Sequence, residues 1–231
     1  MATLPTARER ARAAVLADIK AAAGRAVAAE GASALSLRAV ARELGMVSSA
    51  IYRYFPSRDD LLTALIVDAY DDLGAHAEAA AARSADEPAL RRWQVVCRAV
   101  RAWTLTHPHE YALLYGSPVP GYRAPRTTVG PAARVAFALA GIARDAWERD
   151  ELKLGDDATL DATVARDSAR VADAIGLGGK PAVAARMLVA WTQLFGMLSF
   201  ELFGHLVGSV EDNDAFFDHA TAAMAHYVGL G

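Results

Sequence analysis

The sequence lacks the features that mark secreted or membrane-spanning proteins. Cys97 is the one cysteine among 231 residues, so no disulfide can form within the chain, which fits a reducing cytosol. The N-terminal stretch has no apolar core of the signal-peptide type. The longest uncharged run, Met187–Phe200, lies between Arg186 and Glu201 and is too short to span a bilayer as a helix. We therefore expect a cytoplasmic protein without a membrane partner.

Strand patterns are also missing. No stretch alternates convincingly between apolar and polar residues, and β-branched runs are few. No repeat with the period of about 20–50 residues that is typical of solenoids is visible. Apolar residues make up 54% of the chain, which is ample for a core, and alanine and leucine are abundant. The composition and helical periodicity predict an all-α protein.

Glycines, prolines and polar breaks mark the ends of the predicted helices. The helices cover about Arg8–Glu30, Leu37–Leu44, Val47–Tyr54, Arg58–Ala82, Pro88–Thr106, His109–Tyr115, Thr127–Leu154, Ala158–Ile175, Ala182–Val207 and Asn213–Tyr227. The polar break Ala82–Pro88 predicts domains at 1–82 and 83–231. The loop Gly116–Pro125 holds three prolines and cannot be helical; a functional loop and a simple connector both remain open.

Two short helices joined by a tight turn stand out between residues 35 and 55. Leu37, Val40, Ala41 and Leu44 recur at helical spacing, and Ser36 and Gly45 suit the N-cap and the C-terminal turn. Met46, Val47, Ile51 and Phe55 are expected to point inward. Residues 1–60 have nine basic and six acidic side chains, a net charge of +3, whereas the remainder carries −6. This arrangement is typical of a helix-turn-helix that reads DNA, although two ordinary packed helices would look similar.

The second short helix is expected to present small and polar residues to a major groove. Ser48 and Ser49 lie near its N-terminus, where base edges are approached, and Ala50 could pack against a thymine methyl group. The candidate DNA-contacting residues are Ser36, Arg38, Ser48, Ser49, Ala50, Tyr52, Arg53, Tyr54 and Arg58. Among them, Tyr52 and Tyr54 suit phosphates, Arg38 suits a phosphate or a guanine, and Arg58 adds charge to a helix N-terminus that suits a phosphate.

These residues carry a resemblance to a known family. The string Val40-Ala41, Leu44-Gly45, Ile51-Tyr52-Arg53-Tyr54-Phe55 and Ser57-Arg58-Asp59-Asp60-Leu61 resembles the N-terminal domain of TetR family bacterial regulators over about residues 8–62. The resemblance implies a three-helix DNA-binding domain, a larger helical domain for ligand binding and dimerisation, and binding to double-stranded operator DNA as a dimer. It also implies a phosphate contact for Tyr52. Val47 and Ala50 depart from the Ser or Thr and the Thr that are usual in the family.

The rest of the chain reads as a helical body. The proline-rich loop and residues 191–206 resemble a C-terminal domain common in actinobacterial members of the family. The helix predicted over Ala182–Val207 is apolar on every side, so it must be covered on two sides. One side could face a second copy, although a monomer core helix would show the same pattern. The predicted homodimer interface comprises Trp191, Phe195, Leu198, Leu202, Phe216 and Phe217.

Large side chains in the body predict a pocket for an aromatic or lipophilic effector. The candidates are Trp103, His107, Tyr111, Tyr115, Phe137 and Trp147, each of which could instead fill the core. His107 and His109 flank a proline without a clear third ligand, so no metal site is expected, and no phosphate-binding glycine loop or other cofactor site is apparent. Cys97 shares a helix face with apolar residues and is interpreted as core, so no catalytic residue is assigned.

The sequence therefore predicts a ligand-responsive transcriptional regulator, a repressor that binds a palindromic operator as a dimer. It is not expected to be an enzyme. A small helical enzyme or carrier of lipid or aromatic ligands is one alternative, and a sequence-tolerant DNA-binding protein is another.

Overall fold

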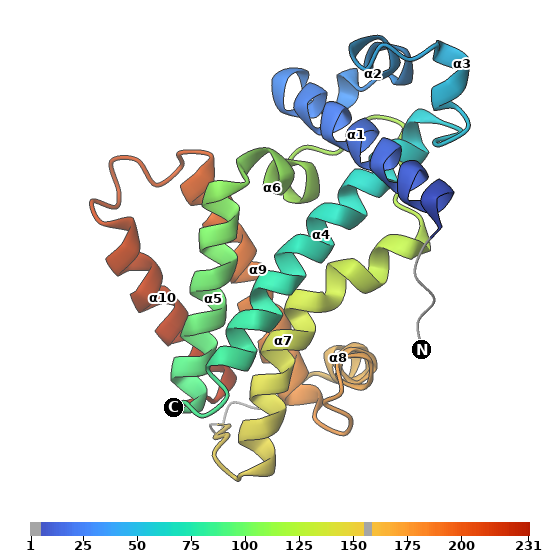
Figure 1. Cartoon of the computed structure of the whole chain (residues 1–231). Coiled ribbons are helices and arrows are strands. Elements are labelled where there is room, and N and C mark those ends of the chain that lie inside the picture. The colour runs from blue at the N-terminus through green and yellow to red at the C-terminus, as the bar shows by residue number, and fades with distance from the viewer. Residues whose placement is uncertain (1–5, 155–158) are drawn as a thin grey trace. The chain divides into compact units, whose positions relative to one another are not determined.

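The computed structural model describes residues 6–154 and 159–231, and within these ranges the regular elements are all helices, with one isolated bridge between Leu152 and Leu230. The all-α prediction is confirmed. The elements are α1 (Ala7–Glu30), η1 (Ala32–Ala34), α2 (Leu37–Glu43), α3 (Ser48–Ile51), α4 (Arg58–Arg83), α5 (Ala89–Thr106), α6 (Pro108–Tyr115), η2 (Arg126–Thr128), α7 (Val129–Glu148), α8 (Ala162–Ala174), α9 (Pro181–Leu202) and α10 (Asn213–Val228) (Figure 1).

The chain divides into two compact units. The first joins Met1–Ala69 to His109–Val129, and the second joins Tyr70–Pro108 to Gly130–Gly231. The division falls inside α4, which is a continuous helix and contributes residues to both units. The proline-rich loop belongs to the first unit, where the hydroxyls of Thr63 and Tyr122 are 3.0 Å apart. The functional boundary near residue 82 stays a prediction.

The first unit is built on a core shared by α1, α2, α3 and the start of α4. Its buried apolar side chains include Ile19, Val27, Leu37, Val40, Ile51, Phe55, Leu61 and Leu62. Ser57 caps α4 as expected, because its Oγ accepts from the Asp60 amide at 3.1 Å and donates to the Asp60 carboxylate at 2.7 Å. This reciprocal cap fixes the point at which the chain leaves the helix-turn-helix.

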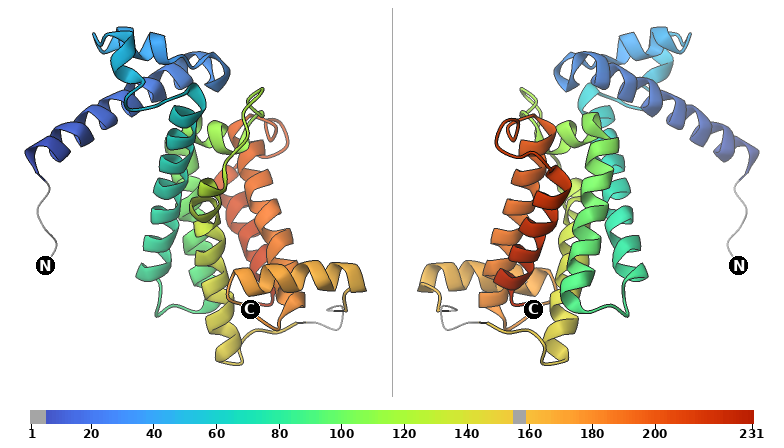
Figure 2. Two further views of the ribbon diagram at one scale, coloured as in Figure 1. Left: turned by 90° about the vertical axis from the view of Figure 1, so that its right-hand side faces the viewer. Right: turned by 90° about the vertical axis from the view of Figure 1, so that its left-hand side faces the viewer.

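The second unit packs α5, α9 and α10 along one another, with α8 lying crosswise against α9 (Figure 2). Trp93, Leu139, Leu194 and Phe217 are among its fully buried core side chains. Burial raises the pKa of the Cys97 thiol well above its ordinary value, which fits the interpretation of Cys97 as core rather than nucleophile.

Ion pairs join the ends of α5, α9 and α10. The Arg101 guanidinium donates to both carboxylate oxygens of Glu201, at 2.8 and 2.6 Å, and lies 2.7 Å from the Asp214 carboxylate. The same guanidinium lies 5.1 Å from the centroid of the Phe217 ring. Because Arg101 and Glu201 are mostly shielded from water, this bidentate pair orients the C-terminal end of α9.

A second arginine joins α7 to α4 within the same unit. Arg134 donates to the main-chain oxygen and the carboxylate of Asp71, at 2.7 and 2.9 Å, and to both carboxylate oxygens of Glu78, at 2.8 and 2.6 Å. The hydrogen bonds from Arg134 hold the pKa of Glu78 below its usual value. Gly74 lies between these acids, and the side chain of Arg134 crosses it. The absence of a side chain at Gly74 is what allows this approach.

Several helices end earlier than the sequence predicts. The regular part of α3 covers Ser48–Ile51 and continues as turns through Tyr54. The seventh helix ends at Glu148, before Asp150 adopts a positive φ of 58°. The ninth ends at Leu202, close to Gly204 with φ of 77°. The expected start of the eighth helix at Ala158 lies outside the described residues.

One helix of the described chain, Pro181–Leu202, is long and apolar enough by length and composition to cross a membrane, with a mean hydropathy of 1.3. Its Val183, Met187, Leu194 and Leu198 are buried in the second unit. Arg186, on the same helix, donates to the main-chain oxygen of Tyr227 at 3.0 Å. These contacts are those of a core helix in a helical unit.

We predict that Gly74→Ala destabilises the fold although alanine favours helix. A Cβ at residue 74 would lie 2.6 Å from the Cβ of Arg134, so the arginine would have to shift away from its carboxylates. Overpacking of this kind costs about 1–3 kcal/mol. The matched control is Gly24→Ala in α1, where nothing lies within 4 Å, and there helix propensity should add up to about 1 kcal/mol of stability. Urea unfolding measures the change in the free energy of unfolding of both variants. A gain in stability in both would contradict the role of Arg134.

Candidate nucleic-acid interface

The turn between α2 and α3 has the geometry that the sequence predicts. Gly45 adopts a φ of 64°, a left-handed conformation that glycine takes without a steric penalty. The Met46 amide then donates to the Ala41 carbonyl at 2.8 Å and closes the end of α2. Because Leu37, Val40 and Ala41 are buried, the anchor face of α2 is as expected. Leu44 is half-buried.

Most of the candidate DNA-contacting residues lie at the surface of the first unit. The exposed ones are Ser36, Arg38, Ser48, Ser49, Tyr52 and Arg53. Ser36 occupies the N-cap position of α2, but its side chain accepts no capping hydrogen bond. Arg42, which the sequence analysis did not single out, is exposed on α2 as well. This surface therefore offers hydroxyls, one tyrosine and three arginines without an apolar covering.

Two residues of the turn lie opposite to expectation. Val47 was expected to point inward, yet 71% of it is exposed. Ala50 was expected to face outward, yet it is 9% exposed and belongs to the core beside Ile51. The reason is that α3 begins one residue later than predicted, with Val47 as its N-cap in an extended conformation. The apolar surface next to Ser48 is thus provided by Val47, and Ala50 is not placed to contact a thymine methyl group.

Tyr54 and Arg58 both make contacts within the first unit. Tyr54 is half-buried, and the Arg12 guanidinium of α1 lies 5.2 Å from the centroid of its ring. Arg12 was not a predicted site residue, and no local pattern marks it.

Arg58 turns towards the chain before α2. Its Nη2 donates to the carbonyls of Ala32 and Ser33, at 2.8 and 3.2 Å, and its Nε donates to the carbonyl of Leu35 at 3.2 Å. It therefore ties the start of α4 to η1, and nothing in this geometry directs its guanidinium towards an external phosphate. The sequence could not reveal this contact, because η1 itself was not predicted.

The predicted effector-binding residues are divided between the two units. Tyr111 and Tyr115 lie in the first, with ring centroids 5.1 Å apart. Trp103 and His107 lie in the second and stack at 5.0 Å, and the Trp103 Nε1 donates to the Asp72 carboxylate at 2.6 Å.

The other two predicted effector-binding residues lie on α7. Phe137 and Trp147 are both exposed, and the Lys180 ammonium lies 5.0 Å from the centroid of the Trp147 ring. Of the six candidates, Trp103 lines a cavity described below.

The predicted dimer residues also behave differently from one another. Phe195, Leu198 and Phe217 are buried in their own chain and so are not available to a partner. Trp191 and Leu202 are half-buried, and Phe216 is exposed. The physical reason is that α9 presents a different stripe to solvent, formed by Leu188, Val189, Gly196, Phe200 and Phe203.

Comparison with known proteins places the chain in a family. Residues 19–65 match the bacterial regulatory proteins of the tetR family, and residues 93–224 match the Tetracyclin repressor-like C-terminal domain. The HTH-type transcriptional regulator Rv1816 of Mycobacterium tuberculosis is 39% identical over 200 residues, 84% of this chain and 83% of that protein. Mb1846 of Mycobacterium bovis matches equally. The chain belongs to the TetR family.

Solved structures agree with the family assignment. The regulatory protein SCO4313 superposes with a TM-score of 0.76 and 34% identity, covering 96% of this chain and 100% of that one. A protein of unknown function from Rhodococcus sp. RHA1, with a TM-score of 0.66 and 24% identity, shares the fold over 92% of this chain and 93% of its own. This TetR family member is a DNA-binding transcriptional regulator with a helix-turn-helix in its N-terminal unit.

We predict that Arg58→Ala lowers stability by about 1–3 kcal/mol, because the carbonyls of Ala32, Ser33 and Leu35 lose a charged donor. Arg53→Ala is the control: Arg53 is exposed, and surface substitutions of this kind stay within about 0.5 kcal/mol. Thermal unfolding of both variants provides the comparison. Equal stability would mean that Arg58 does not brace η1.

Proposed function

We propose that this regulator is a repressor that binds a palindromic operator as a homodimer and is released by a small effector. The observation that carries the proposal is the set of exposed apolar side chains along α9 and at its C-terminal end. Val189, Gly196 and Phe200 lie along the exposed side of α9, with the polar Thr192 and Gln193 between the first two, and the exposed Phe203 is the C-cap of the helix. Phe200 alone is 54% exposed.

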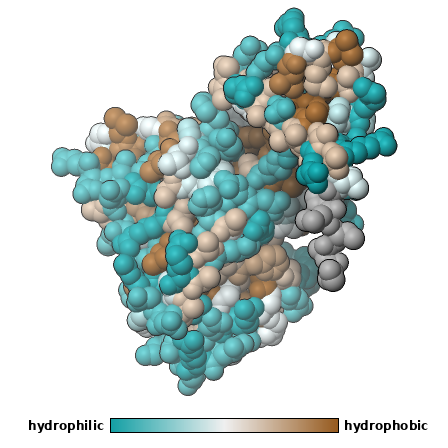
Figure 3. Space-filling model, in the orientation of Figure 1, coloured by the Kyte–Doolittle hydropathy of each residue, from teal (hydrophilic) through white to brown (hydrophobic). Residues whose placement is uncertain are grey.

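The apolar surface continues beyond α9. Val207, in the loop to α10, is 84% exposed, and Phe216 at the start of α10 is 40% exposed. Figure 3 shows brown, apolar surface over this loop at the upper left. Large apolar side chains that gather at one end of a unit are typical of an interface. Two copies that pair through α9 and α10 would form a four-helix contact with two-fold symmetry.

Two-fold symmetry suits the DNA-binding role. A dimer places two recognition elements on half-sites about 34–36 Å apart, so a palindromic operator would match it. Gly196 supports a close helix approach, because nothing lies within 4 Å of the position that its Cβ would occupy.

Arg38, Arg42 and Arg53 would supply phosphate contacts, which set affinity and salt dependence. Ser48, Ser49 and the exposed Val47 would face base edges at the N-terminus of α3. Serine discriminates weakly, so we propose that the contact between Val47 and a thymine methyl group and the shape of the DNA carry much of the sequence preference. The effector would favour a subunit geometry in which the two reading units no longer match the operator.

We predict that Phe200→Glu combined with Phe203→Glu yields a folded monomer that has lost most of its operator affinity. Two charges on this face would be desolvated without partners in a dimer. Light scattering coupled to size exclusion measures the mass, and circular dichroism confirms the fold. Leu105→Glu serves as the control, because Leu105 is an exposed leucine on α5 and its variant should remain dimeric. A double variant that still elutes as a dimer would exclude this face.

We predict that Arg53→Ala weakens binding to operator and to random DNA alike and reduces the salt slope by about one, as expected for a phosphate contact. Val47→Ser should weaken operator binding alone, by up to about tenfold. Fluorescence anisotropy with DNA from upstream of the gene and with random DNA measures both, and the exposed Arg149→Ala is the control. If the unmodified protein binds both DNAs equally, a sequence-tolerant binder replaces the proposed repressor.

A further inference from the structure

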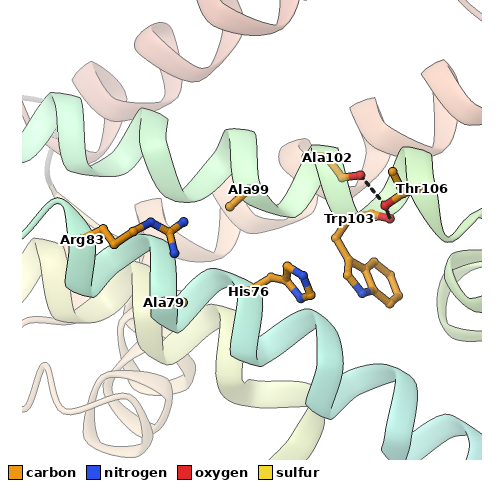
Figure 4. A pocket seen from close by; sticks show the side chains of 7 residues that line it. All are labelled: His76, Ala79, Arg83, Ala99, Ala102, Trp103 and Thr106. Atoms are coloured by element: carbon orange, nitrogen blue, oxygen red, sulfur yellow. Dashed lines mark hydrogen bonds between the residues drawn. The ribbon is translucent and has the colours of Figure 1, made fainter.

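A groove of about 300 Å³ lies between α4 and α5 in the second unit. His76, Ala79 and Arg83 line it from α4, and Ala99, Ala102, Trp103 and Thr106 line it from α5. The α4 residues are spaced at i, i+3 and i+7, and those of α5 at i, i+3, i+4 and i+7. Each set therefore forms a single helical stripe facing the other helix. Figure 4 shows these side chains converging on the space between the two helices.

The shape of the groove follows from the residues that line it. Three alanines make the middle of both walls shallow, and seven residues of helix give a length of about 10 Å. The volume is at the lower end of the range for small-molecule sites, which begins at about 300 Å³. The indole of Trp103 closes one end, where its other neighbours, the His107 ring and the Asp72 carboxylate, fix its orientation. The groove is thus an apolar slot with a rigid aromatic stop.

The two ends of the groove differ in charge. Asp72 lies at the Trp103 end, where it accepts from the indole at 2.6 Å and lies 3.7 Å from His76. Arg83 lies at the other end, in the last turn of α4, and Figure 4 shows its guanidinium extending into the groove. By contrast with Arg83, the nearby Arg134 and Arg92 form ion pairs with carboxylates of their own chain. Asp72 does not itself line the groove, and the slot ends at the Trp103 indole that Asp72 holds. A cation at one end and an aromatic wall at the other select a ligand with one negative end and one apolar end.

We propose that this groove binds a small organic monocarboxylate, with its carboxylate on Arg83 and its apolar body along Ala79, Ala99 and Ala102 towards Trp103. The assignment rests on the proposed effector response and names the chemical class of the effector. Arginine binds a carboxylate through two parallel hydrogen bonds, and this geometry distinguishes it from a neutral amide. The alanine walls accept a flat ring or a short alkyl chain and exclude a bulky one.

The groove is connected along the chain to the first unit, which holds the helix-turn-helix. Its α4 wall belongs to the same continuous helix whose first residue, Arg58, holds η1 next to α2. A ligand that separates α4 from α5 would therefore act on a helix shared with the reading unit. The coupling requires the bound carboxylate to favour one arrangement of α4 over another.

The binding test uses the full chain and matched pairs of probes: benzoate, phenylacetate, 4-phenylbutyrate and octanoate, each against its primary amide. Isothermal titration calorimetry should show that at least one acid binds, and that it binds about tenfold or more tightly than its amide, because only the acid makes a charge-assisted pair. Failure of every acid to bind, or equal binding of acid and amide, overturns the proposal.

Variants locate the site. Arg83→Gln should remove the preference for acid over amide, and Ala99→Leu should block both by filling the slot. The controls are Arg91→Gln and Ala75→Leu, exposed positions on α5 and α4 outside the groove, which should bind like the unmodified protein. Thermal unfolding checks that each variant is folded. If Ala99→Leu does not fold, Ala102→Leu is used to fill the groove instead. If a folded variant with leucine in the groove still binds the acid as tightly as the unmodified protein does, the acid does not bind in this groove.

DNA binding separates this inference from the proposed function. Operator affinity is measured with and without the acid that binds most tightly, for the unmodified protein and for Ala99→Leu. Release of DNA in the unmodified protein alone supports both proposals. Release in both proteins leaves the effector response intact but moves it away from this groove. Binding of the acid without any change in operator affinity supports the groove as a carboxylate site and contradicts its regulatory role.

Discussion

Helix α9 carries large apolar side chains on more than one side, so more than one of its sides must be covered, and this constrains the second unit. One stripe, including Val183, Leu194 and Leu198, is buried against the helices of its own chain. The opposite stripe, ending at Phe200 and Phe203, remains exposed. Burying apolar area is worth about 25 cal/mol per Å², so an uncovered stripe of large side chains favours association strongly. The ion pairs of Arg101 with Glu201 and Asp214 matter because they hold this stripe in a fixed orientation.

The DNA-reading unit depends on local geometry to a greater extent than on core size. Gly45 provides the left-handed turn, Ser57 and Asp60 cap α4, and Arg58 donates to three main-chain carbonyls in and just after η1. Each contact orders backbone close to α3, whose regular part spans only Ser48–Ile51. A helix this short has little stability of its own, so its position must come from packing and from these braces. That rigidity is what allows a few exposed side chains to meet base edges in a defined register.

Helix α4 brings the functional features of the protein onto one element. It begins with the Arg58 brace, carries Gly74 beneath Arg134, and ends with the wall of the α4–α5 groove at His76, Ala79 and Arg83. A helix of 26 residues is about 39 Å long by its rise per residue. The same helix therefore contributes to the cap next to the helix-turn-helix, to the core and to the proposed effector site.

Periodicity, capping residues and glycine positions were enough to predict the all-α fold, the ends of α1 and α2 and the Gly45 turn, whereas the family was predicted from the resemblance of the string between Val40 and Leu61. These features depend on neighbours within a few residues, so the local sequence contains the necessary information. The orientation of Val47 was wrong because Val47 is the extended N-cap of α3 and so does not share the inward face of the helix. Ala50 was wrongly placed because the face that buries Ile51 also buries its neighbour Ala50. The exposed stripe of α9 could not be identified, since a helix that is apolar all round gives no sign of which side faces inward. The Arg58 contacts and the α4–α5 groove join residues distant in sequence, and only the packing of the helices brings them together.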